Sequence, residues 1–159
     1  MEHLFSAAAG YAVAQIPPYH DRAKGKASVL VLGCIDPRYS NDLAWYLTHN
    51  QKLHADYDLI TMAGAELGVF HSNCWRDMYN DHINLALKLH GIEEVWVFSH
   101  MDCGMYKAFH SMPKDDDESK HIDTMNELKK MLKASHPELK FQGHIISQMG
   151  HIKIVIPSA

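Results

Sequence analysis

Residues 29–38 read Val29-Leu30-Val31-Leu32-Gly33-Cys34-Ile35-Asp36-Pro37-Arg38, an apolar run that leads directly into reactive side chains. Residues 95–104 repeat this arrangement as Val95-Trp96-Val97-Phe98-Ser99-His100-Met101-Asp102-Cys103-Gly104. Apolar runs without alternation are typical of parallel strands that are covered on both faces. Ligands bind to α/β sheets just beyond the carboxyl ends of such strands. The two stretches therefore predict neighbouring strands that bring Cys34 and His100 together.

The rest of the chain alternates predicted strands with predicted helices. We expect strands at about 28–33, 57–62 and 94–99, helices at 40–49, 73–90 and 119–135, and a terminal hairpin from 141–146 and 151–156. The Ala-rich residues 3–15 are expected to form a further helix that ends at Pro17-Pro18. The predicted fold class is α/β: a mostly parallel β-sheet flanked by helices, with an N-terminal helical arm over 1–26 and a C-terminal hairpin. Because no linker or repeat interrupts the chain, residues 1–159 are expected to form one domain.

Two finer predictions concern the helices. Ser40 or Asn41 is expected to cap the helix at 40–49, because short polar side chains accept hydrogen bonds from free amides at helix starts. Gly91 is expected to stop the helix at 73–90. The apolar residues expected on the inner side of that helix are Met78, Ile83, Leu85, Leu87 and Leu89.

Composition limits the classes of partner. The chain has 159 residues, 47% of them hydrophobic, with 15 Lys and Arg and a net charge of −4, so we expect no nucleic-acid partner. No apolar run approaches the ~20 residues that span a bilayer, so we expect no membrane partner. Three cysteines are an odd number for a disulfide framework, and they favour a reducing, cytoplasmic location with metal or catalytic roles. Cys74 is expected to be a spare, inert thiol.

Cys34, His100 and Cys103 form a candidate metal site. Two thiolates and one imidazole suit Zn²⁺, and a three-ligand set leaves the fourth tetrahedral position for water, substrate or a mobile carboxylate. The 66 residues between Cys34 and His100 exclude a compact zinc finger and indicate a site assembled by the fold. For Cys34 taken alone, a buried small hydrophobic residue is the competing interpretation.

Asp36 and Arg38 are the candidate catalytic residues beside this site. Asp36 is two residues from Cys34, where it can order a water or accept its proton, and Arg38 can hold the carboxylate in a bidentate pair. If Arg38 lets go, Asp36 becomes a possible fourth metal ligand. The competing interpretation is a structural salt bridge. The N–H of Gly64, in the turn after the second predicted strand, is a candidate substrate contact.

The motifs Cys34-x-Asp36-x-Arg38 and His100-x-x-Cys103-Gly104 resemble those of the β-class carbonic anhydrases, zinc enzymes that interconvert carbon dioxide and bicarbonate. The resemblance covers residues 28–110, and the predicted hairpin at 143–152 resembles the last strands of that family. It implies Zn²⁺ on Cys34, His100 and Cys103, an Asp36/Arg38 dyad, and a homodimer or higher homo-oligomer in which the N-terminal helix lies across its partner.

One departure from the family pattern bears on activity. The family usually has Arg-Asn-Ala-Gly-Asn after the second strand, whereas this chain reads Thr61-Met62-Ala63-Gly64-Ala65. We predict zinc-dependent, reversible hydration of CO₂ to bicarbonate and a proton, because the ligand set and the dyad are intact. The alternatives are a related hydrolase of COS or CS₂, which apolar walls around Met62, Met101 and Met105 would tolerate, and a catalytically silent zinc-binding member of the family.

Overall fold

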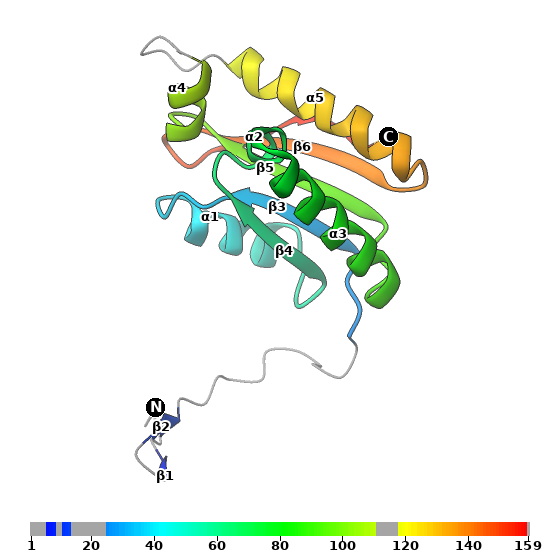
Figure 1. The fold of residues 1–159 in the computed structure, drawn as a ribbon. Coiled ribbons are helices and arrows are strands. Elements are labelled where there is room, and N and C mark those ends of the chain that lie inside the picture. Colours follow the sequence, from blue (N-terminus) through cyan, green and yellow to red (C-terminus); the bar gives the residue numbers. More distant parts are fainter. Residues whose placement is uncertain (1–5, 9–10, 14–24, 111–117, 159) are drawn as a thin grey trace.

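The computed structural model describes residues 6–8, 11–13, 25–110 and 118–158 (Figure 1). Its centre is a five-stranded sheet with the strand order β4-β3-β5-β6-β7. The strands are β3 (Val29–Cys34), β4 (Tyr57–Met62), β5 (Glu94–His100), β6 (Lys140–Ile146) and β7 (Ile152–Ile156). The first four pair in parallel, and β7 returns antiparallel to β6. The predicted fold class, a mostly parallel sheet with a terminal hairpin, is confirmed.

Helices connect the strands. They are α1 (Ser40–Trp45), which continues into a π-helical turn η1 (Tyr46–Asn50), α2 (Glu66–His71), α3 (Asn73–Leu89), α4 (Gly104–His110) and α5 (Glu118–Ser135). Gly91 ends the α3 region with a φ of 74°, a backbone conformation that glycine adopts without steric cost. No helix among the described residues is long and apolar enough to cross a bilayer.

The two faces of the sheet are covered differently, as successive residues of β3 show. Leu30 and Leu32 join the larger core, which packs under α2, α3 and α5. Val29 and Val31 join a smaller core on the opposite face, under α1 and η1. The apolar run that predicted β3 is therefore buried on both faces.

Two helix predictions are wrong in detail. Leu85 and Leu89 are 51% and 60% exposed, because the buried stripe of α3 consists of Tyr79, Ile83 and Ala86, spaced by four and three residues, and both leucines point away from it. Ser40 is the first residue of α1 rather than its cap, and its hydroxyl donates a hydrogen bond to Pro37 O at 3.3 Å.

The expected N-terminal helix at 3–15 is also wrong where the structure describes it. Ser6–Ala8 (β1) and Tyr11–Val13 (β2) pair as antiparallel strands. Gly10 lowers the helix propensity of this segment, whereas Tyr11 and Val13 are residue types that favour strands. Most of the expected arm over 1–26 lies outside the described residues, and the assignment of 1–159 to one domain stays a prediction.

Gly68 allows α2 to approach β4 closely. A Cβ atom there would lie 2.5 Å from Met62 Cγ and 2.6 Å from Ala63 O, whereas a Cβ on Gly104 would meet nothing within 4 Å. We expect Gly68→Ala to lower the free energy of unfolding by about 1–3 kcal/mol, because backbone atoms must move to admit the methyl group. The control Gly104→Ala should cause no loss, since alanine favours helices. Urea unfolding of both variants checks this, and equal stabilities would contradict it.

His144 makes the stability of the smaller core depend on pH. Its ring is fully buried and stacks on Phe98 at 4.0 Å, and burial lowers its pKa from 6.5 to about 4. Between these two pH values the unfolded chain binds a proton that the folded protein does not, so stability is lost as pH falls from about 6.5 to 4. The loss attributable to His144 is about 3 kcal/mol.

The variant His144→Phe should therefore lose less stability over this pH range, because its ring can stack on Phe98 and cannot titrate. The measurement is the free energy of unfolding at pH 7, 5.5 and 4.5 for both proteins, with the metal content held equal. Parallel pH profiles would show that His144 is not the responsible group.

Candidate metal centre

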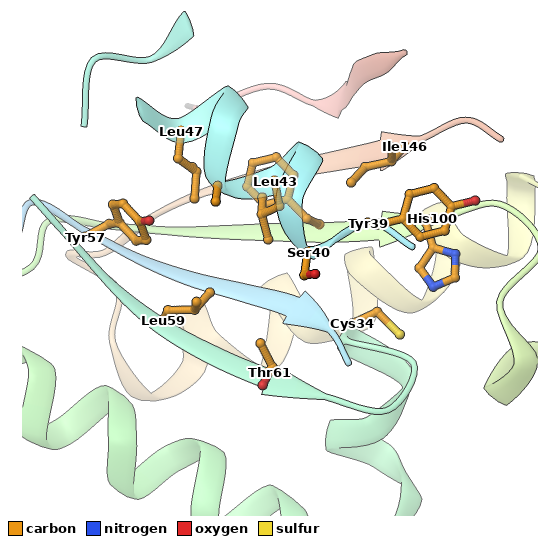
Figure 2. Close-up of a pocket in the computed structure, with 12 residues that line it drawn as sticks. Cys34, Tyr39, Ser40, Leu43, Leu47, Tyr57, Leu59, Thr61, His100 and Ile146 are labelled. Carbon is orange, nitrogen blue, oxygen red and sulfur yellow. The ribbon is translucent and has the colours of Figure 1, made fainter. Parts of the chain in front are cut away.

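Neighbouring strand ends bring the candidate metal ligands together. Cys34 ends β3, His100 ends β5, and Cys103 lies just before α4. Because β3 and β5 pair in parallel, their carboxyl ends meet, and the ligand atoms of the three residues all lie within 4.8 Å of one another. Figure 2 shows the side chains of Cys34 and His100 facing each other at one end of a pocket. The residues predicted to form the site are brought together.

The imidazole of His100 is held in an orientation suited to a metal. Its Nδ1 donates a hydrogen bond to Met101 O at 2.9 Å, and its ring stacks on Tyr39 at 4.3 Å. With the proton on Nδ1, the lone pair is on Nε2, which is buried and has no hydrogen-bond partner among the described residues. An unpartnered buried nitrogen beside two sulfurs fits a metal ligand, so the donor set suits Zn²⁺.

The two sulfurs interact strongly with each other. A hydrogen bond from Cys103 lowers the pKa of Cys34 to about 4, against the opposing effect of burial, while the Cys34 thiolate raises the pKa of Cys103. Backbone amides point at both sulfurs, those of Asp36 and Gly64 at Cys34 and those of Met105 and Tyr106 at Cys103. The protein thus surrounds both sulfurs with donors that stabilise thiolates, the form that binds metal.

Asp36 and Arg38 form the predicted pair at the mouth of this site. Arg38 donates from Nε to Asp36 Oδ1 at 2.9 Å and from Nη2 to Asp36 Oδ2 at 2.7 Å. These hydrogen bonds hold the pKa of Asp36 at about 2, so the carboxylate is ionised at neutral pH. Asp36 Oδ2 lies 3.9 Å from His100 Nε2, the candidate ligand atom.

Asp102 is a partner of Arg38 that the sequence analysis missed. Arg38 Nη1 donates to Asp102 Oδ2 at 3.0 Å and Nη2 donates to Asp102 O at 3.2 Å, while Lys107 forms an ion pair with the other carboxylate oxygen. Arg38 therefore ties the loop after β3 to the loop after β5. A carboxylate beside the ligand Cys103 was the available signal, but sequence spacing does not show which cation it meets.

Gly64 lies beside the site in a conformation that other residues rarely adopt. Its φ is 72°, and a Cβ there would lie 2.7 Å from Met105 Cγ. Its amide faces Cys34 Sγ, so the contact found is with a metal ligand. The predicted contact of Gly64 with substrate stays a prediction.

A small apolar pocket of about 60 Å³, partly open to solvent, adjoins the metal centre (Figure 2). Cys34 and His100 line one end, and side chains of α1, η1, β4, β5 and β6, with Tyr39 just before α1, line the rest. The apolar and aromatic lining residues are Tyr39, Leu43, Ala44, Leu47, Tyr57, Leu59, Phe98 and Ile146. Ser40 and Thr61 supply the only hydroxyl groups of aliphatic side chains in this lining. The pocket suits a small apolar molecule better than a charged one.

The chain is similar in sequence to proteins of two Rickettsia species. The chain is 24% identical over 145 residues to an uncharacterized protein of Rickettsia bellii (strain RML369-C), covering 87% of this chain and 88% of that protein. A second uncharacterized protein, from Rickettsia conorii (strain ATCC VR-613 / Malish 7), is 24% identical over 147 residues, covering 87% and 78%. These relatives support descent from a common ancestor and say nothing of activity.

Two solved structures share the fold. Carbonic anhydrase from Glaciozyma antarctica superimposes with a TM-score of 0.55 at 21% identity, covering 82% of each chain. The β-carbonic anhydrase CafA of Aspergillus fumigatus gives a TM-score of 0.52 at 16% identity, covering 84% of this chain and 78% of the other. A family model described as "Putative carbonic anhydrase" matches residues 24–156. The chain therefore belongs to the carbonic anhydrase family that this model describes, and it has the fold of the β-carbonic anhydrases.

Proposed function

We propose that this protein is a zinc-dependent enzyme that reversibly hydrates carbon dioxide to bicarbonate and a proton. The observation that carries the proposal is the convergence of Cys34, Cys103 and the unpartnered Nε2 of His100 beside an ionised carboxylate held by Arg38. Family membership supports the same activity. Asp36 and Arg38 are the proposed catalytic residues, and Gly64 is a proposed substrate contact.

Cys34, His100 and Cys103 would hold Zn²⁺, which supplies a Lewis acid that makes water more acidic and more nucleophilic at neutral pH. Two thiolates donate more charge than imidazoles, which weakens this effect. The four backbone amides that face the two sulfurs draw part of that charge away. A general base or a hydrogen-bond acceptor close to the nucleophilic water remains useful to the reaction.

Asp36 is the proposed hydrogen-bond acceptor for that water. Its oxygen, 3.9 Å from His100 Nε2, would accept a hydrogen bond from the water and orient it for attack on CO₂, a role that suits a carboxylate whose pKa is about 2. Arg38 keeps both carboxylate oxygens fixed and their charge stable through two hydrogen bonds. When Arg38 releases it, Asp36 is a possible fourth ligand that closes the site.

The reaction also needs a place for CO₂ to bind, and the apolar pocket is the proposed one. CO₂ carries no charge and no hydrogen-bond donor, so walls such as Leu43, Phe98 and Ile146 admit it without loss of solvation. Bicarbonate is charged and strongly hydrated, and the same walls favour its release. COS and CS₂ share the linear, apolar shape of CO₂, and this lining does not distinguish among them.

We further propose a homodimer or higher homo-oligomer, as the family resemblance implies, and a reducing compartment such as the cytoplasm. All three cysteines are free in the described structure, which suits thiols that must remain available to a metal. Large apolar side chains on the surface, such as Ile35 at 61% and Phe109 at 58% exposed, supply area that a second copy can cover.

Protein purified under reducing, chelator-free conditions should contain one zinc per chain and accelerate CO₂ hydration in a stopped-flow indicator assay. Removal of zinc by a chelator should abolish the activity and its return should restore it. Full zinc content with a rate equal to that of buffer would identify a silent zinc-binding protein. Release of hydrogen sulfide from COS or CS₂, without CO₂ hydration, would identify the sulfur-substrate alternative.

Asp36→Asn should retain zinc but lower kcat by about 100-fold or more, because the neutral amide loses the bidentate pair with Arg38 and no longer holds a charged acceptor oxygen toward the water. Elemental analysis and stopped-flow assays of the same sample separate the two effects. Asp123→Asn, at an exposed position on α5, is the matched control and should leave both unchanged. If Asp36→Asn loses its zinc, Asp36 is mainly a ligand. If it keeps full activity, Asp36 is not a catalytic residue.

A further inference from the structure

Four polar side chains form a buried cluster behind the metal centre, and the proposed reaction does not use them. Glu66, Tyr106 and His121 are 0% exposed and Ser99 is 1% exposed. Tyr106 Oη donates to Glu66 Oε1 at 2.6 Å, Ser99 Oγ and His121 Nδ1 share a hydrogen bond of 2.6 Å, and His121 Nδ1 lies 3.6 Å from Glu66 Oε1. We call these residues the buried polar cluster.

Burial of these polar side chains costs free energy that apolar side chains in the same core would not cost. Polar groups lose their hydration on burial, and Glu66 Oε2 has no hydrogen-bond partner among the described residues. Apolar side chains of similar volume often stabilise a protein more than a buried polar pair does. The cluster therefore calls for a role beyond filling space.

Its members lie next to the groups that surround the two sulfurs. Glu66 begins α2, two residues after Gly64, whose amide faces Cys34 Sγ. Tyr106 lies in α4, and its own amide faces Cys103 Sγ. The 2.6 Å hydrogen bond between Tyr106 and Glu66 thus joins the two segments that carry these amide donors.

The segment that carries Gly64 also needs an anchor. Ala65 has a φ of 46° and a ψ of −111°, which is unfavourable for a residue with a Cβ. The strained turn persists only if its surroundings hold it, and Glu66 follows it directly. On the other side of the cluster, Ser99 precedes the ligand His100 in β5 and bonds to His121 of α5.

We propose that Tyr106 and Glu66 are positioning residues of the metal centre, whose hydrogen bond keeps one backbone amide on each of the two metal-binding sulfurs. The proposal rests on the proposed metal centre, and it does not require turnover of CO₂. Hydrogen bonds from amides reduce the charge that thiolates donate to a metal. Groups that bond to the ligands in this way help to set the affinity of the site for the metal and the electronic structure of the bound metal. Burial and the nearby Glu66 carboxyl group raise the pKa of Tyr106, which keeps its hydroxyl proton as the donor.

The test compares two tyrosines that are both 0% exposed. Tyr106→Phe removes the hydroxyl that bonds to Glu66, whereas Tyr79→Phe removes a hydroxyl that has no hydrogen-bond partner among the described residues. The readouts are zinc affinity, by competition with a chromophoric chelator, and the sulfur-to-metal charge-transfer and d–d bands of the Co²⁺-substituted protein. Thermal unfolding of each variant identifies those that fold.

We expect Tyr106→Phe to lower zinc affinity by about 10-fold or more and to shift the Co²⁺ bands, and Tyr79→Phe to change neither. Glu66→Gln keeps an oxygen that accepts the Tyr106 hydroxyl and should retain the native bands. Glu66→Leu removes the acceptor and should reproduce the Tyr106→Phe spectrum. This rescue by the conservative variant separates positioning from a general loss of stability.

Folded Tyr106→Phe and Glu66→Leu proteins with native zinc affinity and native Co²⁺ bands would overturn the proposal. Equal effects of Tyr106→Phe and Tyr79→Phe on zinc affinity and on the Co²⁺ bands would also overturn it. Such a result would show that the buried polar cluster only fills space in the core. Native protein that binds no zinc would end both this proposal and the proposed function. Native protein that binds zinc without hydrating CO₂ would end the proposed function alone.

Discussion

The parallel pairing of β3 with β5 is the constraint on which the rest of the structure depends. Register pairs run from Val29 with Glu94 to Gly33 with Phe98, so the two strands end together. The residue after Gly33 is Cys34, and His100 lies two residues beyond Phe98. A shift of one residue in this register would turn one ligand to the opposite face of the sheet. The metal centre is thus fixed by backbone hydrogen bonds.

Much of this arrangement is predictable from the sequence, because the signals are local. The strands β3, β4 and β5 are apolar runs bounded by polar or glycine-containing turns, and their predicted ends differ from the observed ends by at most one residue. Their convergence follows from the right-handed crossover that links parallel strands. The same rule places Cys34 beside His100, so the candidate ligands needed no structure to be identified.

The remaining features depend on contacts that the sequence does not display. The exposure of Leu85 and Leu89 follows from which stripe of α3 meets the sheet, and this is decided by packing. The link from Arg38 to Asp102 joins residues 64 positions apart. The strands found in place of the expected N-terminal helix show that local pairing of two short segments overrides an Ala-rich composition. In each case the contacts made in the folded protein decide the outcome, and the local sequence pattern does not show them.

The smaller core has a second consequence. Tyr39, Leu43, Leu47, Phe98 and Ile146 belong both to this core and to the lining of the pocket. A change that widened the cavity for a bulkier molecule would remove buried apolar atoms, at a cost of about 2–5 kcal/mol for a leucine reduced to alanine. The side chains that determine which molecules fit the pocket are therefore also side chains that stabilise the fold. Evolution of a wider pocket therefore requires stabilising substitutions elsewhere in the chain to come first.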